Sequence, residues 1–269
     1  MGKPTTSGQP TRKQGELLRA EGVVVKFGSK TVLDGLSLSI DSGENVAILG
    51  GSGTGKSVFL KLVVGLLEPE QGSIHLWGQS TEGLDEDAWI PFRRRMGMVF
   101  QSGALFDSMS VFENIAFPMR QRGDSDEGAI AKRVEECLAW VDLEGVGRQT
   151  PSELSGGMRR RVALARTISF EPEFVLYDEP TTGLDPVTAR KISRLIRDLD
   201  TKLSSTSILV THDIECARTV ASRWTYLAGG KIVADGTPSE LLSSGDEDLR
   251  EFLLGGDPAR DLPLGRKRQ

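Results

Sequence analysis

The chain has 269 residues, of which 38% are hydrophobic, and a formal net charge of -5. This length and apolar content allow a large buried core, and the mixed charges argue against a surface that neutralises many nucleic-acid phosphates. The two cysteines, Cys137 and Cys216, stand apart without metal-ligand spacing. They indicate buried thiols in a reducing compartment and argue against a disulfide framework or a transition-metal site.

The ends and apolar stretches of the chain bear on its location. Residues 1–16 are polar and lack the apolar run of a secretory signal, so we expect a flexible N-terminal arm. No stretch approaches the roughly 18 consecutive apolar residues of a membrane-spanning helix. We therefore expect a cytoplasmic protein.

The first half of the chain predicts strands followed by a glycine-rich loop. Alternating apolar and polar residues over 36–40, and valines at 23–25, indicate antiparallel strands. Residues 46–49 form a continuous apolar run, typical of a strand buried on both faces. A helix is predicted over 56–67, and a hairpin around 72–78 and a strand at 96–100 should follow.

The second half predicts a helical insertion and then alternating strands and helices. From Gln101 to about Thr150 loops and helices dominate, and residues 130–141 carry an apolar stripe at helical spacing that we assign to core packing. A strand, a helix and a strand are predicted at 174–177, 186–203 and 207–210, which is the pattern of a parallel sheet. A hairpin over 224–233, a short helix from Pro238 and a tail over 245–269 complete the prediction.

A phosphate-binding motif lies between the apolar run and the first helix. Gly50, Gly55, Lys56 and Ser57 match G-x-x-x-x-G-K-[ST], and the strand and helix around them are the context that this motif requires. Glycines let backbone N–H groups approach phosphates, Lys56 can contact the β and γ phosphates, and Ser57 can ligate Mg²⁺. A glycine-rich structural turn is the alternative, which this context disfavours.

Two acidic residues end a second apolar strand, in the segment FVLYDE. Asp178 and Glu179 should therefore lie at the carboxyl end of the sheet, where parallel sheets bind ligands. There Asp178 would bind Mg²⁺, and Glu179 would polarise the water that attacks the γ-phosphate. Taken alone, such a pair of acids is usually a solvated turn.

A second anion-binding pattern occurs at residues 154–158, LSGGM. Ser155 is a good helix N-cap, and Gly156 and Gly157 expose backbone donors at the start of a helix. An isolated SGG would be an ordinary cap, but a second anion site in a P-loop protein needs an explanation.

This combination resembles the ABC ATPases, with a resemblance that spans about residues 17–242. Gln101 matches their Q-loop, residues 183–185 (Gly183, Leu184 and Asp185) match the D-loop, His212 in THD matches the switch histidine, and Phe27 stands where an aromatic stacks on adenine. The resemblance implies an α/β fold: a P-loop NTPase ABC cassette with a RecA-like core, an antiparallel β subdomain and an inserted α-helical subdomain at about 102–165. The ATPase domain would cover 17–244.

The resemblance also implies a head-to-tail homodimer in which one chain's P-loop and the other chain's signature enclose each ATP. His212 would contact the γ-phosphate, and Gln101 would connect Mg²⁺ and the attacking water to the helical lobe. The implied catalytic residues are Lys56, Gln101, Glu179 and His212. The implied ATP-binding residues are Phe27, Gly50, Gly51, Ser52, Gly53, Thr54, Gly55, Lys56, Ser57 and Val58. Those implied for the metal are Ser57, Gln101 and Asp178, and those for the signature are Leu154, Ser155, Gly156, Gly157 and Met158.

Within this family, the Phe- and Met-rich segment 105–120, together with Gly51, Val58 and Met158, looks like the Mla/Mce class of lipid transport ATPases. That likeness implies phospholipid movement between bacterial membranes, at the cytoplasmic face of the inner membrane. It also implies a permease dimer, an Mce-domain lipid-binding protein and a small regulatory domain protein as partners. The tail at 245–269 would reach the neighbouring subunit. Phe27, Val58 and Met158 depart from the commonest residues of the wider family, but none of these changes removes a catalytic group.

Three alternatives share parts of this pattern. An ATPase of an importer for amino acids or other polar solutes would carry every catalytic motif. A non-transport ABC ATPase of DNA repair or translation usually has long coiled coils or two cassettes, and the chain shows neither. An ordinary P-loop kinase or GTPase would leave the segment LSGGM and His212 without a role.

Overall fold

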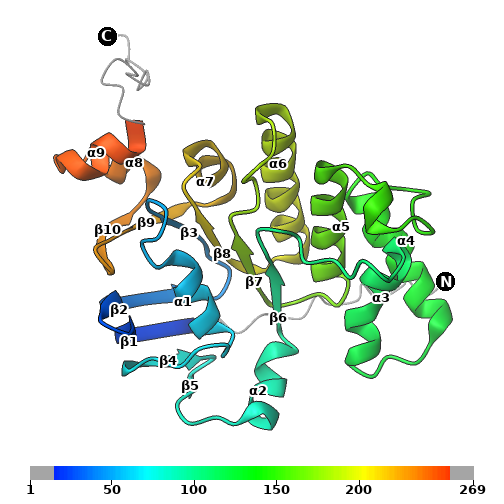
Figure 1. Ribbon diagram of the computed structural model, residues 1–269, viewed down its shortest axis with the longest axis horizontal. Coiled ribbons are helices and arrows are strands. Elements are labelled where there is room, and N and C mark those ends of the chain that lie inside the picture. The colour runs from blue at the N-terminus through cyan, green and yellow to red at the C-terminus, as the bar shows by residue number, and fades with distance from the viewer. Residues whose placement is uncertain (1–14, 255–269) are drawn as a thin grey trace, which may run out of the picture.

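A four-stranded antiparallel sheet opens the part of the chain, residues 15–254, that the computed structural model describes. Its order is β2-β1-β4-β5, made of β1 (Glu16–Phe27), β2 (Lys30–Asp41), β4 (Gln71–Leu76) and β5 (Gln79–Ser80). Leu36, Leu38 and Ile40 of β2 are buried and alternate with exposed neighbours, so the predicted alternation is confirmed. This sheet lies at the lower left of Figure 1.

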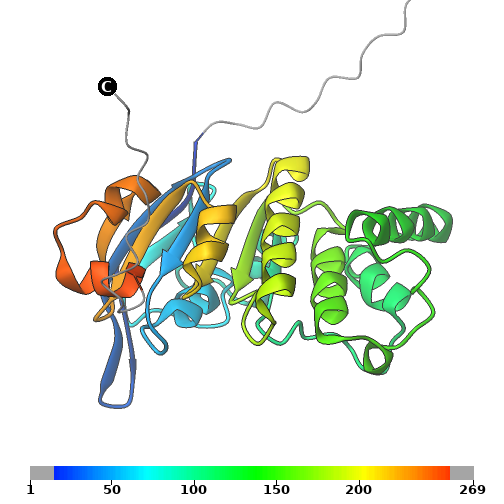
Figure 2. The same cartoon turned by 90° about the horizontal axis from the view of Figure 1, so that it is seen from above.

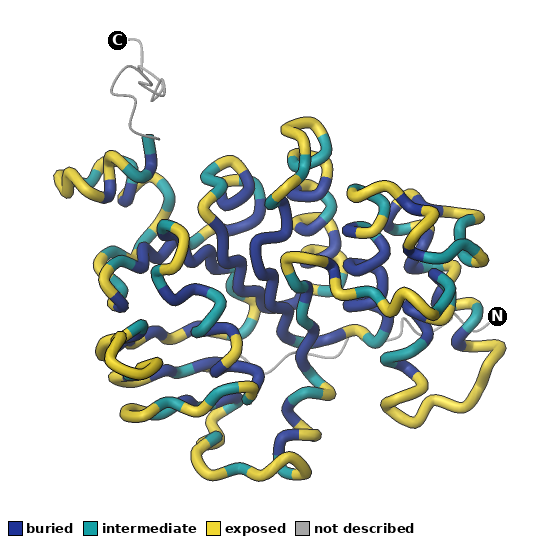
Figure 3. The backbone as a smooth tube through the Cα atoms, viewed as in Figure 1, coloured by how far each residue is buried: buried dark blue, intermediate teal, exposed yellow. Residues whose placement is uncertain are grey.

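A six-stranded mixed sheet forms the centre of the molecule, in the order β10-β9-β3-β8-β7-β6. The strands are β3 (Asn45–Leu49), β6 (Met96–Val99), β7 (Phe174–Asp178), β8 (Thr206–Thr211), β9 (Arg223–Ala228) and β10 (Lys231–Gly236). All pairs are parallel except β9 with β10. Every residue of β7 and β8 is buried, as the dark blue central strands of Figure 3 show. Their apolar runs are therefore explained by cover on both faces.

The two faces of this sheet belong to two hydrophobic cores. Val175, Tyr177 and Leu209 join the core shared with the helical lobe, whereas Leu176 and Ile208 join the core beneath the antiparallel sheet. Successive side chains of β7 and β8 point to opposite faces of the sheet, so the same two strands contribute to both hydrophobic cores.

The helices around the sheet include three that were predicted and two, over residues 86–93 and 214–220, that were not. They are α1 (Lys56–Val63), α2 (Glu86–Arg93), α6 (Pro186–Leu203), α7 (Ile214–Val220) and α8 (Pro238–Leu242). The prediction for α6 is confirmed to the residue. The prediction of a helix to residue 67 is wrong, because α1 ends at Val63. Gly65 adopts a φ of +71°, and a Cβ there would lie 2.2 Å from the ring of Trp89, so the chain turns away early to let that indole pack.

The inserted helical lobe extends from one side of the central sheet, at the right of Figures 1 and 2. It contains α3 (Val111–Gln121), α4 (Glu127–Trp140), the 3-10 turn η1 (Pro151–Glu153) and α5 (Gly156–Ile168). The predicted stripe is buried in its core, at Ile130, Val134, Leu138 and Val141.

The two ends of the described chain complete the fold. Residues that sequence analysis assigned to the tail form α9 (Glu247–Leu254), whose Leu249 and Leu253 are buried and whose Phe252 ring lies 5.1 Å from that of Tyr226. Most of the predicted arm and the rest of the tail, residues 1–14 and 255–269, lie outside the described residues. Between residues 15 and 254, no helix has the length and apolar character needed to cross a membrane.

Candidate functional site

The predicted phosphate loop joins the end of β3 to the start of α1, so its backbone N–H groups lie at a helix N-terminus. Gly55 has a φ of +108° at the helix cap, a conformation that strongly favours glycine. A Cβ on Gly50 would lie 2.6 Å from the carbonyl oxygen of Leu227. Both motif glycines are therefore required by the local backbone and its neighbours.

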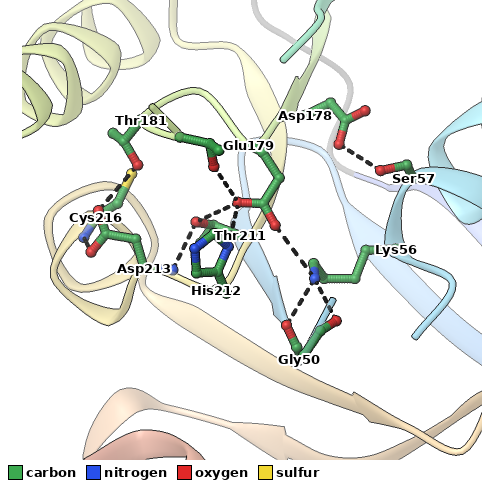
Figure 4. Close-up of polar contacts among 12 residues, drawn as sticks. Gly50, Lys56, Ser57, Asp178, Glu179, Thr181, Thr211, His212, Asp213 and Cys216 are labelled. Atoms are coloured by element: carbon green, nitrogen blue, oxygen red, sulfur yellow. Dashed lines mark hydrogen bonds and ion pairs between the residues drawn. The ribbon is translucent and has the colours of Figure 1, made fainter. Parts of the chain in front are cut away.

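Lys56 is buried and turns back over the loop that precedes it. Its Nζ donates to the carbonyl oxygens of Gly50 and Gly51 at 2.8 and 2.9 Å, and it lies 3.4 Å from Glu179 Oε1 (Figure 4). An ammonium group with two carbonyls and one carboxylate around it is a compact positive charge at the mouth of the loop.

Ser57 and Asp178 bring two oxygen ligands together from different elements. Ser57 Oγ, in the first turn of α1, donates to Asp178 Oδ1 at the end of β7 at 2.8 Å (Figure 4). Burial raises the pKa of Asp178, and the hydrogen bond from Ser57 opposes that rise. A hydroxyl and a carboxylate are the hard oxygen donors that Mg²⁺ prefers, so this pair fits such an ion. The described chain holds no cluster of three or more His, Cys, Asp or Glu side chains that could bind a metal.

Glu179 follows directly, and its carboxylate is the centre of a small polar network. The residue has a φ of +48°, rare for a side chain of this kind, and its N–H still pairs with the carbonyl of Val210 at 3.0 Å. Its Oε2 accepts from Thr182 Oγ1 at 3.1 Å and lies 2.9 Å from His212 Nδ1. The strained backbone thus aims the carboxylate between Lys56 and His212 (Figure 4).

Asp178 is buried, whereas Lys56, Ser57, Glu179 and His212 line one cavity of about 490 Å³. It brings together segments far apart in the sequence: the β1–β2 turn, the phosphate loop, the loop after β6, and the ends of β7 and β8. Of the residues that sequence analysis selected, those lining it are Phe27, Ser52, Gly53, Gly55, Lys56, Ser57, Val58, Gln101, Glu179 and His212. Thr54 closes the loop through a hydrogen bond to the carbonyl of Gly51 at 2.9 Å.

The signature and D-loop residues lie apart from this cavity, around a second groove of about 1010 Å³. Its lining includes Ser155, Gly156, Gly157, Met158, Gly183, Leu184 and Asp185, while Leu154 is buried in the adjoining core. Ser155 Oγ accepts from the N–H of Met158 at 3.3 Å and so caps α5. Asp185 caps α6 by accepting from the N–H groups of Val187 and Thr188, and the hydrogen bond with the Thr188 side chain, together with these backbone bonds, holds its pKa below the usual value. A single chain thus keeps the two segments that the sequence predicts to bind anions in two separate places.

Gly157 shows why glycine stands at one signature position. A Cβ on this residue would lie 2.9 Å from Thr188 Cγ2 of α6. The glycine therefore lets the start of α5 approach the start of α6 closely, which places the signature beside the D-loop.

Sequence reasoning missed several residues of the site, among them Val32, which lines the cavity from β2. Thr182 and Thr211 both donate to Glu179 Oε2, at 3.1 and 3.4 Å, and Lys30 lines the cavity from the β1–β2 turn. Thr182 could have been found from its position three residues after Glu179. Lys30 carries no local signal, because only the packing of the antiparallel sheet brings it to the phosphate loop.

Comparison with known sequences identifies close relatives. The protein-family model for ABC transporters matches residues 33–182. The chain is 42% identical over 239 residues to the "Intermembrane phospholipid transport system ATP-binding protein MlaF" of Haemophilus influenzae, covering 89% of this chain and 90% of that protein. It is 40% identical over 253 residues to the "Probable ribonucleotide transport ATP-binding protein mkl" of Mycobacterium tuberculosis, covering 94% of this chain and 70% of that protein.

Comparison with solved structures gives the same architecture. The ATP-binding cassette MJ0796, in a dimeric post-hydrolysis state bound to ADP and Pi, matches with a TM-score of 0.75 and 34% identity over 82% of this chain and 98% of that one. The predicted fold class, an α/β cassette with an antiparallel β subdomain and an inserted helical subdomain, is therefore confirmed.

Proposed function

Because this chain belongs to the ABC transporter family of ATP-binding proteins, we propose that it hydrolyses ATP to energise the transport of phospholipids between membranes. One observation carries the proposal: a single cavity joins the phosphate loop, Lys56, Gln101, Glu179 and His212, in a chain 42% identical to a phospholipid transport ATP-binding protein. The predicted likeness to the Mla class agrees with that relative.

Different residues of the site bind the adenine, the phosphates and the metal ion of the nucleotide. Phe27 stacks on the adenine, which needs only the ring face, and Lys56 with the loop N–H groups binds the phosphates. Ser57 and Asp178 would hold Mg²⁺, with Gln101 lining the same cavity as Ser57, and the ion would neutralise charge on the phosphate oxygens.

Glu179 and His212 act on the attacking water and on the γ-phosphate. Glu179 accepts a hydrogen bond from the attacking water and polarises it, while His212 faces the same cavity and contacts the γ-phosphate. Thr182, which donates to Glu179, fixes the orientation of that carboxylate. The left-handed backbone of Glu179 keeps the group within reach of both Lys56 and His212.

A complete site requires two copies of the chain. The signature residues lie around a groove separate from the cavity that holds the phosphate loop, so Ser155 of the partner subunit would close each site over ATP. The dimeric cassette found among the solved relatives supports this arrangement. ATP would close the homodimer and hydrolysis would reopen it.

The membrane partner is an integral-membrane permease dimer, and the helical lobe offers a surface for it. A groove of about 370 Å³ runs between α2 and α3, lined by Ile90, Arg93, Pro118 and Gln121 among others. Phe106, in the Phe- and Met-rich segment 105–120, is 40% exposed, and its ring lies 4.9 Å from that of Phe117. Such exposed apolar side chains favour a partner surface.

We place the protein at the cytoplasmic face of the bacterial inner membrane, with an Mce-domain lipid-binding protein and a small regulatory domain protein as further partners.

Reconstitution tests this function. The chain, its permease and the Mce-domain protein would be placed in vesicles carrying a fluorescent phospholipid, and transfer to acceptor vesicles would be followed with and without ATP. We expect ATP-dependent transfer with the wild-type chain and none with Lys56→Ala. Uptake of a labelled amino acid or ribonucleotide, with no lipid transfer, would reject the lipid assignment in favour of a polar-solute importer.

A further inference from the structure

The signature helix α5 buries two arginines, Arg160 and Arg166, which are only 7% and 9% exposed. Burial lowers the pKa of both guanidinium groups. A buried charge is costly unless it is well hydrogen-bonded, yet no acidic side chain among residues 15–254 forms an ion pair with either arginine. Main-chain carbonyl groups are their acceptors, so the position of those carbonyls is tied to α5.

Arg166 and its neighbour hold both sides of the loop that carries Gln101. Arg166 donates to the carbonyl oxygens of Gly103 and Ala104 at 3.0 and 2.7 Å. Thr167 Oγ1 lies 3.3 Å from the carbonyl oxygen of Met98 in β6, while its shorter hydrogen bond, at 2.9 Å, goes to the carbonyl of Ala163 within α5. The end of β6 and the loop after it are thus fastened along the length of α5.

Arg160 reaches two loops at once. Its Nη1 donates to the carbonyl oxygen of Phe100, the residue before Gln101, at 2.9 Å, and its Nη2 lies 3.4 Å from the carbonyl oxygen of Thr182. Thr182 in turn donates through its hydroxyl to Glu179 Oε2 at 3.1 Å. The guanidinium therefore stands between the Gln101 loop and the loop that orients Glu179, and it does not itself line the nucleotide cavity.

We propose that Arg160 is a positioning residue that ties the signature helix to Gln101 and Glu179 of the same chain. The inference rests on the proposed function, because Ser155 at the start of α5 would contact the ATP bound by the partner subunit. Arg160 lies little more than one helical turn from Ser155. A shift of α5 when Ser155 engages that ATP is then passed to the catalytic groups of its own chain, which couples the two sites of the dimer.

The first test separates positioning from nucleotide binding. In Arg160→Met, kcat for ATP should fall by about 10- to 100-fold, because the loop carrying Thr182 is no longer held, while the ATP dissociation constant stays near wild type. Arg160→Lys keeps the charge and one donor and should recover part of the loss. Wild-type kcat in Arg160→Met, or an equal loss of ATP affinity, would overturn the inference.

The second test asks whether Arg160 acts on the catalytic residues of its own chain or on those of the partner subunit. In mixed dimers, one chain carries Glu179→Gln so that only the other chain's Glu179 supports turnover. Arg160→Met should then lower turnover when it lies in the chain that retains Glu179, and much less when it lies in the chain supplying the signature. The reverse pattern would assign Arg160 to support of the signature and overturn the inference.

A matched control and a double mutant complete the design. Arg133 also donates to two backbone carbonyls, those of Ile168 and Ser169 at the C-terminal end of α5, far from Ser155, so Arg133→Met should keep wild-type kcat. Arg160→Met and Thr182→Val should be non-additive, since both act on Glu179 through one loop. Additive losses would overturn the proposed link between Arg160 and Glu179 through Thr182.

If the wild-type chain hydrolysed no ATP, the proposed function and this inference would fail together, whereas normal wild-type turnover with unaffected variants would remove only the inference.

Discussion

Buried carboxylates lie at both ends of the parallel strands of the central sheet, which we call its carboxyl edge and its amino edge. The groups that surround these carboxylates differ between the two edges. At the carboxyl edge, Glu179 lies 3.4 Å from the Lys56 ammonium and lines an open cavity. Toward the amino edge, Asp200 of α6 is 2% exposed and accepts hydrogen bonds from Tyr177 OH at 2.7 Å, Ser207 Oγ at 2.8 Å and Ser205 Oγ at 3.2 Å. None of the cations among residues 15–254 forms an ion pair with Asp200.

The absence of a nearby cation changes the protonation of Asp200. Without a compensating cation, burial raises the pKa of Asp200 to about 6, although the three hydroxyl donors oppose the rise. Ser207 Oγ also lies 2.9 Å from Asn45 Oδ1, and its single hydrogen cannot serve both acceptors. When Asp200 is protonated, its own O–H can be donated to Ser207 Oγ, which is then free to donate to Asn45 Oδ1. A carboxylate beside a cation and a cavity is equipped for chemistry, whereas one among neutral donors in a sealed core acts on stability.

The largest effect should come from the carboxyl edge. Glu179→Gln keeps the side-chain shape and the acceptor for Thr182 but removes the negative charge, so kcat for ATP should fall by about 10³-fold. ATP binding and the free energy of unfolding should change little. Turnover, equilibrium ATP binding and urea unfolding measure the three quantities. Wild-type-like hydrolysis by this variant would remove Glu179 from its proposed role.

The amino edge should respond in stability and not in turnover. Because the folded-state pKa of Asp200 is raised to about 6 from 3.8, the folded chain binds this proton more tightly than the unfolded chain. Its contribution to stability is full below pH 3.8 and is lost as pH rises to about 6, a span worth about 3 kcal/mol. Asp200→Asn, which is always neutral, should therefore gain stability relative to wild type by about that amount between pH 4 and pH 7.

A neighbouring residue supplies the control for this pH dependence. Asp198 is exposed on the same helix and pairs with Arg197, so Asp198→Asn should show no such relative gain. Urea unfolding at several pH values measures each variant against wild type, and ATP turnover should match wild type in both. A pH-independent difference for Asp200→Asn would show that this carboxyl titrates normally in the fold.

The two edges were not equally visible in the sequence. The phosphate loop and the pair Asp178–Glu179 were predicted because each motif is contiguous and its strand and helix are read from local patterns. The Asp200 network joins residues from α6, β7 and β8 that carry no common spacing, and Asp200 looks like any polar residue of an amphipathic helix. Only packing reveals it.

The same limit applies to Arg160 and to the end of α1. Arg160 stands among three successive arginines, and nothing in that run shows which one turns inward. The early end of α1 depends on the ring of Trp89, which arrives from a helix that begins more than twenty residues later and contains Pro91. Contacts between distant segments decide both features, so local patterns cannot supply them.

The smallest expected effect comes from the hydrogen bond between Tyr177 and Asp200 at the amino edge. Tyr177→Phe removes the hydroxyl that donates to Asp200 Oδ1 and leaves the ring in place, which should cost about 1 kcal/mol of stability. Because this hydrogen bond favours the ionised carboxyl, its loss should raise the pKa of Asp200 further. The destabilisation should therefore be larger at pH 7.5, where Asp200 is ionised, than at pH 5, with turnover unchanged. An equal loss at both pH values would mean that the hydrogen bond from Tyr177 does not favour the ionised form of Asp200.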